Sequence, residues 1–154
     1  WFKDELLAAR DTHALTIWVN PVPWISSPSE EGEADDWSGF VAERAELADF
    51  IGGHGLASSL LMAAGDAHMV AIDDGTNSDY SALGGAGFPI LHCAALDRPG
   101  SIKGGPYSHG AFPGGGQFGL IEVTDDGGSQ IEVALSGRNW RNEDLVAYKF
   151  TVPA

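Results

Sequence analysis

The chain has 154 residues and a formal net charge of −14, from 22 acidic and 8 basic side chains. This length fits a single domain, residues 1–154, that buries a core of its own. The acidic balance argues against nucleic acid or an anionic membrane surface as a partner. No run approaches the roughly 18 apolar residues that a membrane-spanning helix requires. Cys93 is the single cysteine, so an internal disulfide is excluded, and we expect this residue to be a small core side chain.

The first forty residues indicate a helix, a strand and a loop. Apolar residues at helical spacing within residues 1–10 are typical of the end of a helix, and the chain begins at Trp1 rather than methionine, as a fragment or a processed product would. Ala14–Val19 is an apolar, β-rich run that stops at Asn20, because the prolines that follow cannot donate to a ladder. Asn20 therefore occupies a strand end, either as an ordinary turn asparagine or as a ligand. Residues 26–36 are rich in Ser, Pro, Glu and Asp, which predicts an exposed, mobile acidic loop.

An amphipathic helix follows this loop. Apolar residues recur at steps of three and four from Trp37 to Ile51, and the pair Gly52-Gly53 ends the pattern. We expect this helix to lie on one face of the sheet.

The segment Leu60–Met69 is the centre of the functional interpretation. Its first five residues are apolar and predict a strand buried on both faces, and Gly65 then lets the backbone turn. The turn exposes Asp66 and His68. Ligands of α/β sheets bind beyond the carboxyl ends of strands, so this pair is placed to hold Zn, Mn or Fe. The alternative is an ordinary Gly-Asp turn beside a surface histidine.

The middle of the chain is dominated by glycine. Twelve of the 21 glycines lie between Gly75 and Gly119, and only Phe88–Ala95 has the apolar density of a strand, with His92 expected in the core. A loop of this length is often a wall or lid over a site. His109 is a candidate to contact a substrate from that loop.

The last third predicts three antiparallel strands. Apolar residues alternate before and after the turn 125–128 and again from Leu145 to Val152. We expect one mixed sheet, in which the central strands Ala14–Val19 and Leu60–Ala64 are neighbours. The three C-terminal strands should extend this sheet at its edge.

Several of these segments, taken in order, resemble PhoD-type alkaline phosphatases, a branch of the calcineurin-like metallophosphoesterases. The similar features are a tryptophan-initiated helix, a strand ending in Asn, an Asp-x-Trp-x-Gly-Phe-x-x-Glu-Arg segment, a strand ending in Gly-Asp-x-His, and a closing Gly-Gln-Phe-Gly-Leu strand. They lie at Trp1–Leu7, Trp18–Pro23, Asp35–Arg44, Ala64–His68 and Gly116–Leu120.

The resemblance implies the C-terminal half of an αββα sandwich, an α/β fold with a mixed sheet and an antiparallel C-terminal hairpin region. It implies a phosphatase or phosphodiesterase that hydrolyses a small phosphate ester, with a multi-metal centre at the strand ends, in a secreted or periplasmic protein. Asn20, Asp66 and His68 would be metal ligands, and His68 would also be catalytic. Two oxygen ligands make Fe, Mn or Ca more plausible than an all-zinc site.

The sequence departs from this family in one respect. The three N-terminal blocks that bring most of its metal ligands are absent from these residues. We therefore expect the isolated chain to be inactive without a missing N-terminal half, whether lost or present as a separate chain. The competing interpretation is a non-catalytic, acidic, β-rich binding or structural module.

Overall fold

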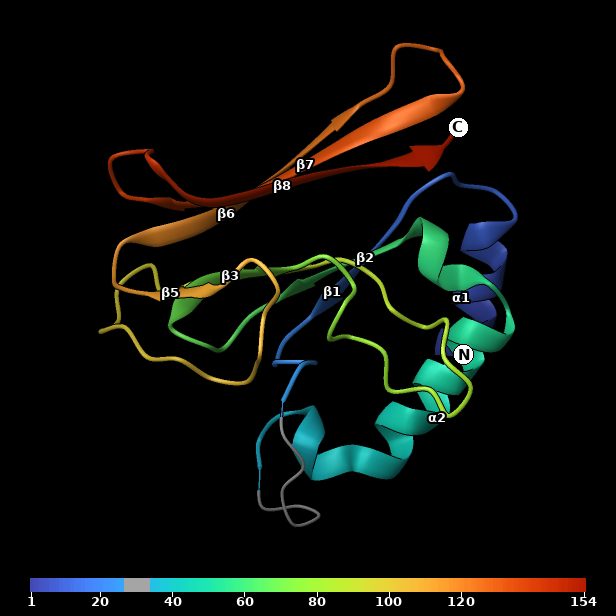
Figure 1. Ribbon diagram of the computed structural model, residues 1–154, viewed down its shortest axis with the longest axis horizontal. Coiled ribbons are helices and arrows are strands. Elements are labelled where there is room, and N and C mark those ends of the chain that lie inside the picture. Colours follow the sequence, from blue (N-terminus) through green and yellow to red (C-terminus); the bar gives the residue numbers. More distant parts are fainter. Residues whose placement is uncertain (27–33) are drawn as a thin grey trace.

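The protein is described by a computed structural model that covers residues 1–26 and 34–154. It is a mixed α/β structure in which a five-stranded sheet carries two helices and a three-stranded antiparallel sheet packs beside it (Figure 1). No helix within these two ranges is long and apolar enough to cross a membrane. The helices are α1 (Phe2–Arg10) and α2 (Val41–Gly53), with short 3-10 helices η1 (Trp37–Phe40) and η2 (Leu56–Ser59).

The five-stranded sheet has the order β1-β2-β4-β3-β5. Its strands β1, β2 and β4 are parallel, whereas β3 is antiparallel to both of its neighbours. The predicted pairing of the first two apolar strands is confirmed, in a register that runs from Thr16 opposite Leu60 to Asn20 opposite Ala64. The expectation that both are central strands is wrong for β1, which lies at the edge of the sheet as the described residues form it. The strand bounds are β1 Thr16–Asn20, β2 Leu60–Ala64, β3 Met69–Asp73, β4 Ile90–His92 and β5 Ala111–Pro113.

Alternate residues of these strands build two separate cores, because successive side chains point to opposite faces of a sheet. On one face, Met62, Met69 and Ile90 pack with Leu6 of α1 and Ile51 of α2. The predicted position of the second helix on the sheet is thus confirmed. The other core holds Leu61, Val70, Ile72, Leu91, Val133, Leu135 and Val146.

The three C-terminal strands β6 (Gln117–Thr124), β7 (Gln130–Asn139) and β8 (Asp144–Pro153) are antiparallel, as predicted. The expectation that they extend the first sheet at its edge is wrong, since they form a second sheet that packs on its face (Figure 1). The physical reason is burial. Val70 and Ile72 of β3 are fully buried on the face away from the helices, and Val133 and Leu135 of β7 supply their apolar partners.

The glycine-rich middle contains a strand that the sequence did not predict, β5. Buried Asp73 stabilises the surrounding turns, because its carboxylate accepts backbone N–H bonds from Gly75, Asn77 and Ser108. The two ends of the predicted acidic loop are not exposed as expected. Residues 27–33 lie outside the described residues, but Ser26 and Asp36 are buried, and the Ser26 hydroxyl donates to Asp36 over 3.1 Å.

Candidate functional site

One edge of the five-stranded sheet gathers the polar residues that end its strands. Asn20 ends β1, the turn 65–68 follows β2, and His92 ends β4, all at carboxyl ends of parallel strands. Because β3 runs the other way, its first residues lie at this edge too. The backbone N–H of Gly65 donates to the carbonyl oxygen of Asn20 over 3.1 Å. The structure therefore places Asn20 and the turn that carries Asp66 and His68 next to each other.

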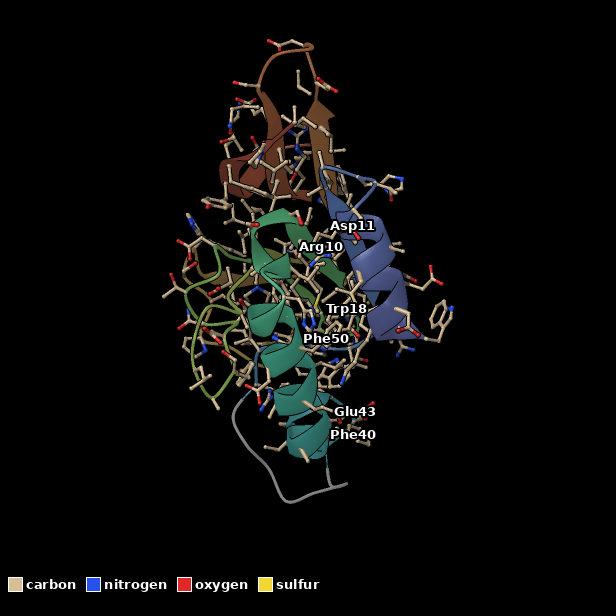
Figure 2. All side chains as sticks on the ribbon, turned by 90° about the vertical axis from the view of Figure 1, so that its right-hand side faces the viewer. Arg10, Asp11, Trp18, Phe40, Glu43 and Phe50 are labelled. Atoms are coloured by element: carbon tan, nitrogen blue, oxygen red, sulfur yellow. The ribbon has the colours of Figure 1, made fainter. Side chains whose placement is uncertain are left out.

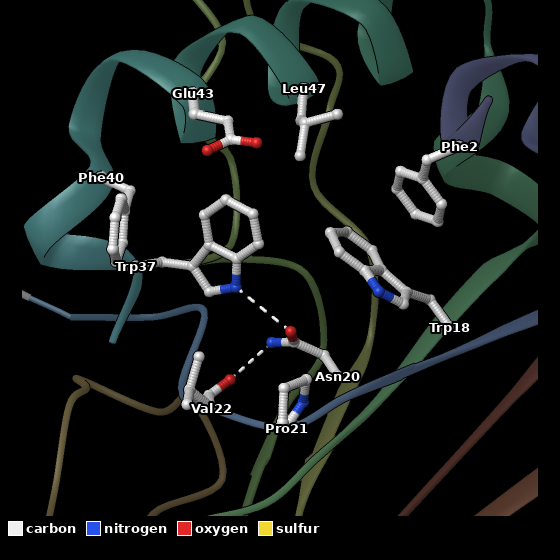
Figure 3. A pocket seen from close by; sticks show the side chains of 9 residues that line it. All are labelled: Phe2, Trp18, Asn20, Pro21, Val22, Trp37, Phe40, Glu43 and Leu47. Carbon is white, nitrogen blue, oxygen red and sulfur yellow. Dashed lines mark hydrogen bonds between the residues drawn. The ribbon is translucent and has the colours of Figure 1, made fainter. Parts of the chain in front are cut away.

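The side chain of Asn20 is buried and already bonded. Its Oδ1 accepts a hydrogen bond from the indole N–H of Trp37 over 3.2 Å, and its Nδ2 donates to the carbonyl oxygen of Val22 (Figure 3). Nδ2 also lies 3.6 Å from the sulfur of Met62. This amide thus ties the end of β1 to η1 and to the loop after β1.

From the sequence, Gly65 is expected to let the backbone turn, but the left-handed residue of the turn is Asp66. Its φ is +74°, a left-handed value that Asp adopts more readily than most residues. Gly65 is required for another reason, since a Cβ there would lie 3.3 Å from the carbonyl oxygen of Pro21. The turn is therefore tight because β1 and β2 approach closely at their ends.

Lys103 is the residue at this edge that the sequence analysis missed. Its ammonium group contacts the carboxylates of both Asp35 and Asp66, and it lies 2.5 Å from Asp35. Burial lowers the pKa of Lys103, but the hydrogen bonds to the two carboxylates raise it more, so the net shift is upward. The hydrogen bond from Lys103 lowers the pKa of Asp35. The Lys103 ammonium group thus bridges the carboxylates of Asp35 and Asp66, and a metal ion bound to Asp66 would compete with it.

His68 is half-buried, and its imidazole makes no hydrogen bond or ion pair with any residue in the described ranges. Its backbone is well fixed, since its carbonyl oxygen accepts from the N–H groups of Ser101 and Gly114 over 3.0 and 3.4 Å. No three His, Cys, Asp or Glu side chains of residues 1–26 and 34–154 lie close enough to hold a metal together. Asp66 and His68 thus offer two donors, and Asn20 is the third candidate beside them.

His92 is fully buried, as predicted for a core residue, but only one of its ring nitrogens is bonded. Nε2 accepts a hydrogen bond from the backbone N–H of Ala67 over 3.2 Å, whereas Nδ1 is buried without a partner among the described residues. Burial lowers the pKa of His92 to about 4. The ring is therefore neutral at pH 7 with its proton on Nδ1, so neither nitrogen is free to bind a metal.

His109 lies away from this edge. Its backbone N–H donates to the carbonyl oxygen of Ile72 near the far end of β3, roughly 13 Å along the strand from His68. Its ring packs against that of Tyr148 with centroids 4.8 Å apart and the planes tilted by 46°, and Nε2 is 3.6 Å from Asp74. The structure thus groups His109 with the second sheet and with the end of β3.

A cavity of about 470 Å³, which we name the Trp18–Trp37 pocket, opens beside Asn20 (Figure 3). Four of its nine lining residues are aromatic, Pro21, Val22 and Leu47 are aliphatic, and the carboxylate of Glu43 is the one charged group among the described residues that line it. Sequence reasoning missed it because the lining residues come from α1, β1, η1 and α2, which only the fold brings together. The aromatic and polar residues that line it are Phe2, Trp18, Asn20, Trp37, Phe40 and Glu43.

The edge therefore has two features side by side, the turn 65–68, whose Asp66 and His68 are candidate metal donors, and the Trp18–Trp37 pocket, with Asn20 beside both. The donors are a carboxylate, an imidazole and an amide, a set suited to a borderline divalent ion. The pocket is suited to an apolar or cationic group. No protein-family model, curated protein or solved structure matches the chain.

Proposed function

We propose that the edge formed by Asn20, Asp66 and His68 is part of the active site of a metal-dependent phosphatase or phosphodiesterase. The observation that carries the proposal is the hydrogen bond between Gly65 and Asn20, which holds the ends of β1 and β2 together. Two strand ends that each carry a donor are thereby fixed at one edge. The layers of helix, sheet and sheet also fit three of the four layers of an αββα sandwich.

Each residue has a role in this proposal. Asp66 and His68 would hold the metal, and the ring nitrogen of His68 that does not bind the metal would donate a hydrogen bond to the phosphate ester, because the imidazole is half-buried and makes no hydrogen bond or ion pair within the described residues. Fe, Mn, Ca or Zn bound there would polarise the phosphoryl oxygens and acidify the attacking water. Lys103 would leave Asp66 and remain near enough to attract the phosphate.

Three donors are too few for the multi-metal centre of this proposal. A catalytic divalent ion needs about three protein ligands and an open position, and a two-metal site needs ligands for both ions. Asn20 would moreover have to release the indole of Trp37 before its Oδ1 faced a metal. The remaining ligands are therefore proposed to come from another segment, and we expect the 154 residues alone to hydrolyse phosphate esters poorly.

The test is metal content and hydrolysis of p-nitrophenyl phosphate. Protein prepared without chelators is assayed by emission spectroscopy, and turnover is measured with added Mn, Fe, Ca or Zn. This chain is compared with a version that includes whatever the natural gene encodes upstream of Trp1. We expect stoichiometric metal and turnover in the longer version, with both lost in His68→Ala.

His13→Ala is the matched control, since His13 is an exposed histidine after α1. Robust metal-dependent turnover by the 154 residues alone would show that the site is misplaced. A longer version that binds no metal would favour the other candidate, a binding module. The Trp18–Trp37 pocket is the observation that favours that candidate.

A further inference from the structure

We propose that the Trp18–Trp37 pocket binds a quaternary ammonium group, such as that of choline or of a fully methylated amine. This pocket shares Asn20 with the proposed metal site, but its proposed ligand is bound without a metal ion. The pocket volume of about 470 Å³ lies in the range of small-molecule sites. Figure 2 shows Trp18 between the two helices, with Phe40 and Glu43 at the beginning of α2.

The first argument is the shape of the aromatic walls. The rings of Trp18 and Trp37 lie 6.1 Å apart with their planes at 78°, so they form a corner that is nearly a right angle. Phe2 and Phe40 stand on either side of this corner in Figure 3. Ring faces carry negative charge density, and a cation over them gains about 0.5–2 kcal/mol from each good contact. Four aromatic side chains around one cavity suit a round, soft cation.

The second argument is that the walls are already in place. Trp24, which is buried, lies 5.4 Å from the ring of Trp18 and 5.1 Å from that of Trp37, both in edge-to-face geometry. The indole N–H of Trp37 is also held by Asn20. Because both indoles are fixed before binding, a ligand does not have to order them, and more of the contact energy appears as affinity.

The third argument is charge. Figure 3 shows the carboxylate of Glu43 turned toward the indole of Trp37, and Glu43 has no ion-pair partner in residues 1–26 and 34–154. The two basic residues that directly follow pocket-lining residues in the sequence, Lys3 after Phe2 and Arg44 after Glu43, are engaged elsewhere. Lys3 lies 2.5 Å from Glu46, and Arg44 is buried and donates to the carbonyl oxygens of Trp24 and Ser26. No described basic side chain lines the pocket, so Glu43 is left to attract a ligand cation.

The fourth argument distinguishes a quaternary ammonium from other cations. A metal ion would need several oxygen ligands in place of its water shell, and the pocket offers one carboxylate. A primary ammonium would need acceptors for three N–H groups, but among the described side chains of the pocket only the Glu43 carboxylate is an unengaged acceptor, since Oδ1 of Asn20 already accepts from Trp37. A methylated nitrogen carries positive charge without N–H groups to satisfy, so it matches aromatic walls with a single acid.

The experiment is isothermal titration calorimetry with choline and with 3,3-dimethyl-1-butanol, its uncharged carbon isostere. We expect choline to bind about tenfold more tightly than the isostere, since tenfold is about 1.4 kcal/mol, within the range of the cation contacts above. Glu43→Gln should lower the affinity for choline by about the same factor and leave that for the isostere unchanged.

Glu46→Gln is the matched control, because Glu46 lies on the same helix but is paired with Lys3 and does not line the pocket. Trp37→Leu should abolish choline binding, whereas Trp140→Leu, at an exposed tryptophan between β7 and β8, should not. Equal affinity for choline and the isostere, or an equal effect of the Glu43 and Glu46 variants, would overturn the proposal. So would the absence of any choline binding by the folded wild-type chain. Glu43→Gln tests the charge without disturbing the core.

Discussion

The indole N–H of Trp37 donates to Oδ1 of Asn20 over 3.2 Å and thereby joins the beginning of η1 to the end of β1. This one bond connects the two candidate sites. Asn20 lies beside the turn that carries Asp66, whereas Trp37 lines the Trp18–Trp37 pocket. Anything that moves Asn20 toward a metal would also free the indole. The two sites are therefore coupled through a single amide.

Asn20→Ala should lower the free energy of unfolding by about 2 kcal/mol. The substitution leaves the Trp37 indole N–H and the Val22 carbonyl without their partner, and a polar group left unsatisfied costs about 1–3 kcal/mol. Urea unfolding measures the change. Val19→Ala, at a neighbouring side chain that is 77% exposed, is the control and should change stability little. Equal losses in both variants would contradict the role given to the amide.

His92 should make stability depend on pH. Burial lowers its pKa in the folded chain from the ordinary value of 6.5 to about 4, so the unfolded chain binds a proton first as the pH falls. The stabilisation that depends on a neutral His92 is fully present in the free energy of unfolding above pH 6.5, and it is lost progressively as the pH falls toward 4. Between pH 7 and pH 5 the loss should be about 2 kcal/mol. Urea unfolding at these two pH values measures it, and in His92→Gln the part due to this histidine should disappear.

Lys103→Met should raise the affinity of the chain for Mn²⁺, if Asp66 and His68 are metal ligands. The variant removes the ammonium group that contacts Asp66 and keeps the aliphatic stem. We expect an increase of about tenfold, which is about 1.4 kcal/mol, measured by titration of the Mn²⁺ electron paramagnetic resonance signal. Lys149→Met, which breaks a pair with Glu132 on the second sheet, is the control. Unchanged Mn²⁺ affinity in Lys103→Met would count against Asp66 as a ligand.

Gly137→Ala should destabilise the contact between the two sheets. A Cβ at this position of β7 would lie 2.6 Å from the Cβ of Val70 on β3, so one of the sheets must shift. Overpacking of this kind typically costs about 1–3 kcal/mol. Gly53→Ala is the matched comparison, because a Cβ at the end of α2 meets nothing within 4 Å and alanine favours a helix. Thermal unfolding should therefore show a lower Tm for the first variant and an equal or higher Tm for the second.

Local patterns in the sequence were enough to predict the main elements. The apolar run that ends at Asn20, the helical spacing after Trp37 and the alternation after Phe118 each predicted an element that the structure contains. They succeeded because strand and helix periods reflect which side chains face the core. That β1 and β2 are neighbours in one sheet was also predicted, since the candidate ligands at their ends can converge only if both carboxyl ends lie at the same edge.

Only the tertiary structure decided what the polar residues do. The sequence placed Asn20, Asp66 and His68 at strand ends, but it gave no sign that Trp37 would bind the amide of Asn20 or that Lys103 would reach Asp66. Nor did it show that the C-terminal strands pack on the face of the first sheet. These contacts join residues far apart in the chain. Their partners are chosen by packing, which brings side chains together in space with no regular spacing in the sequence.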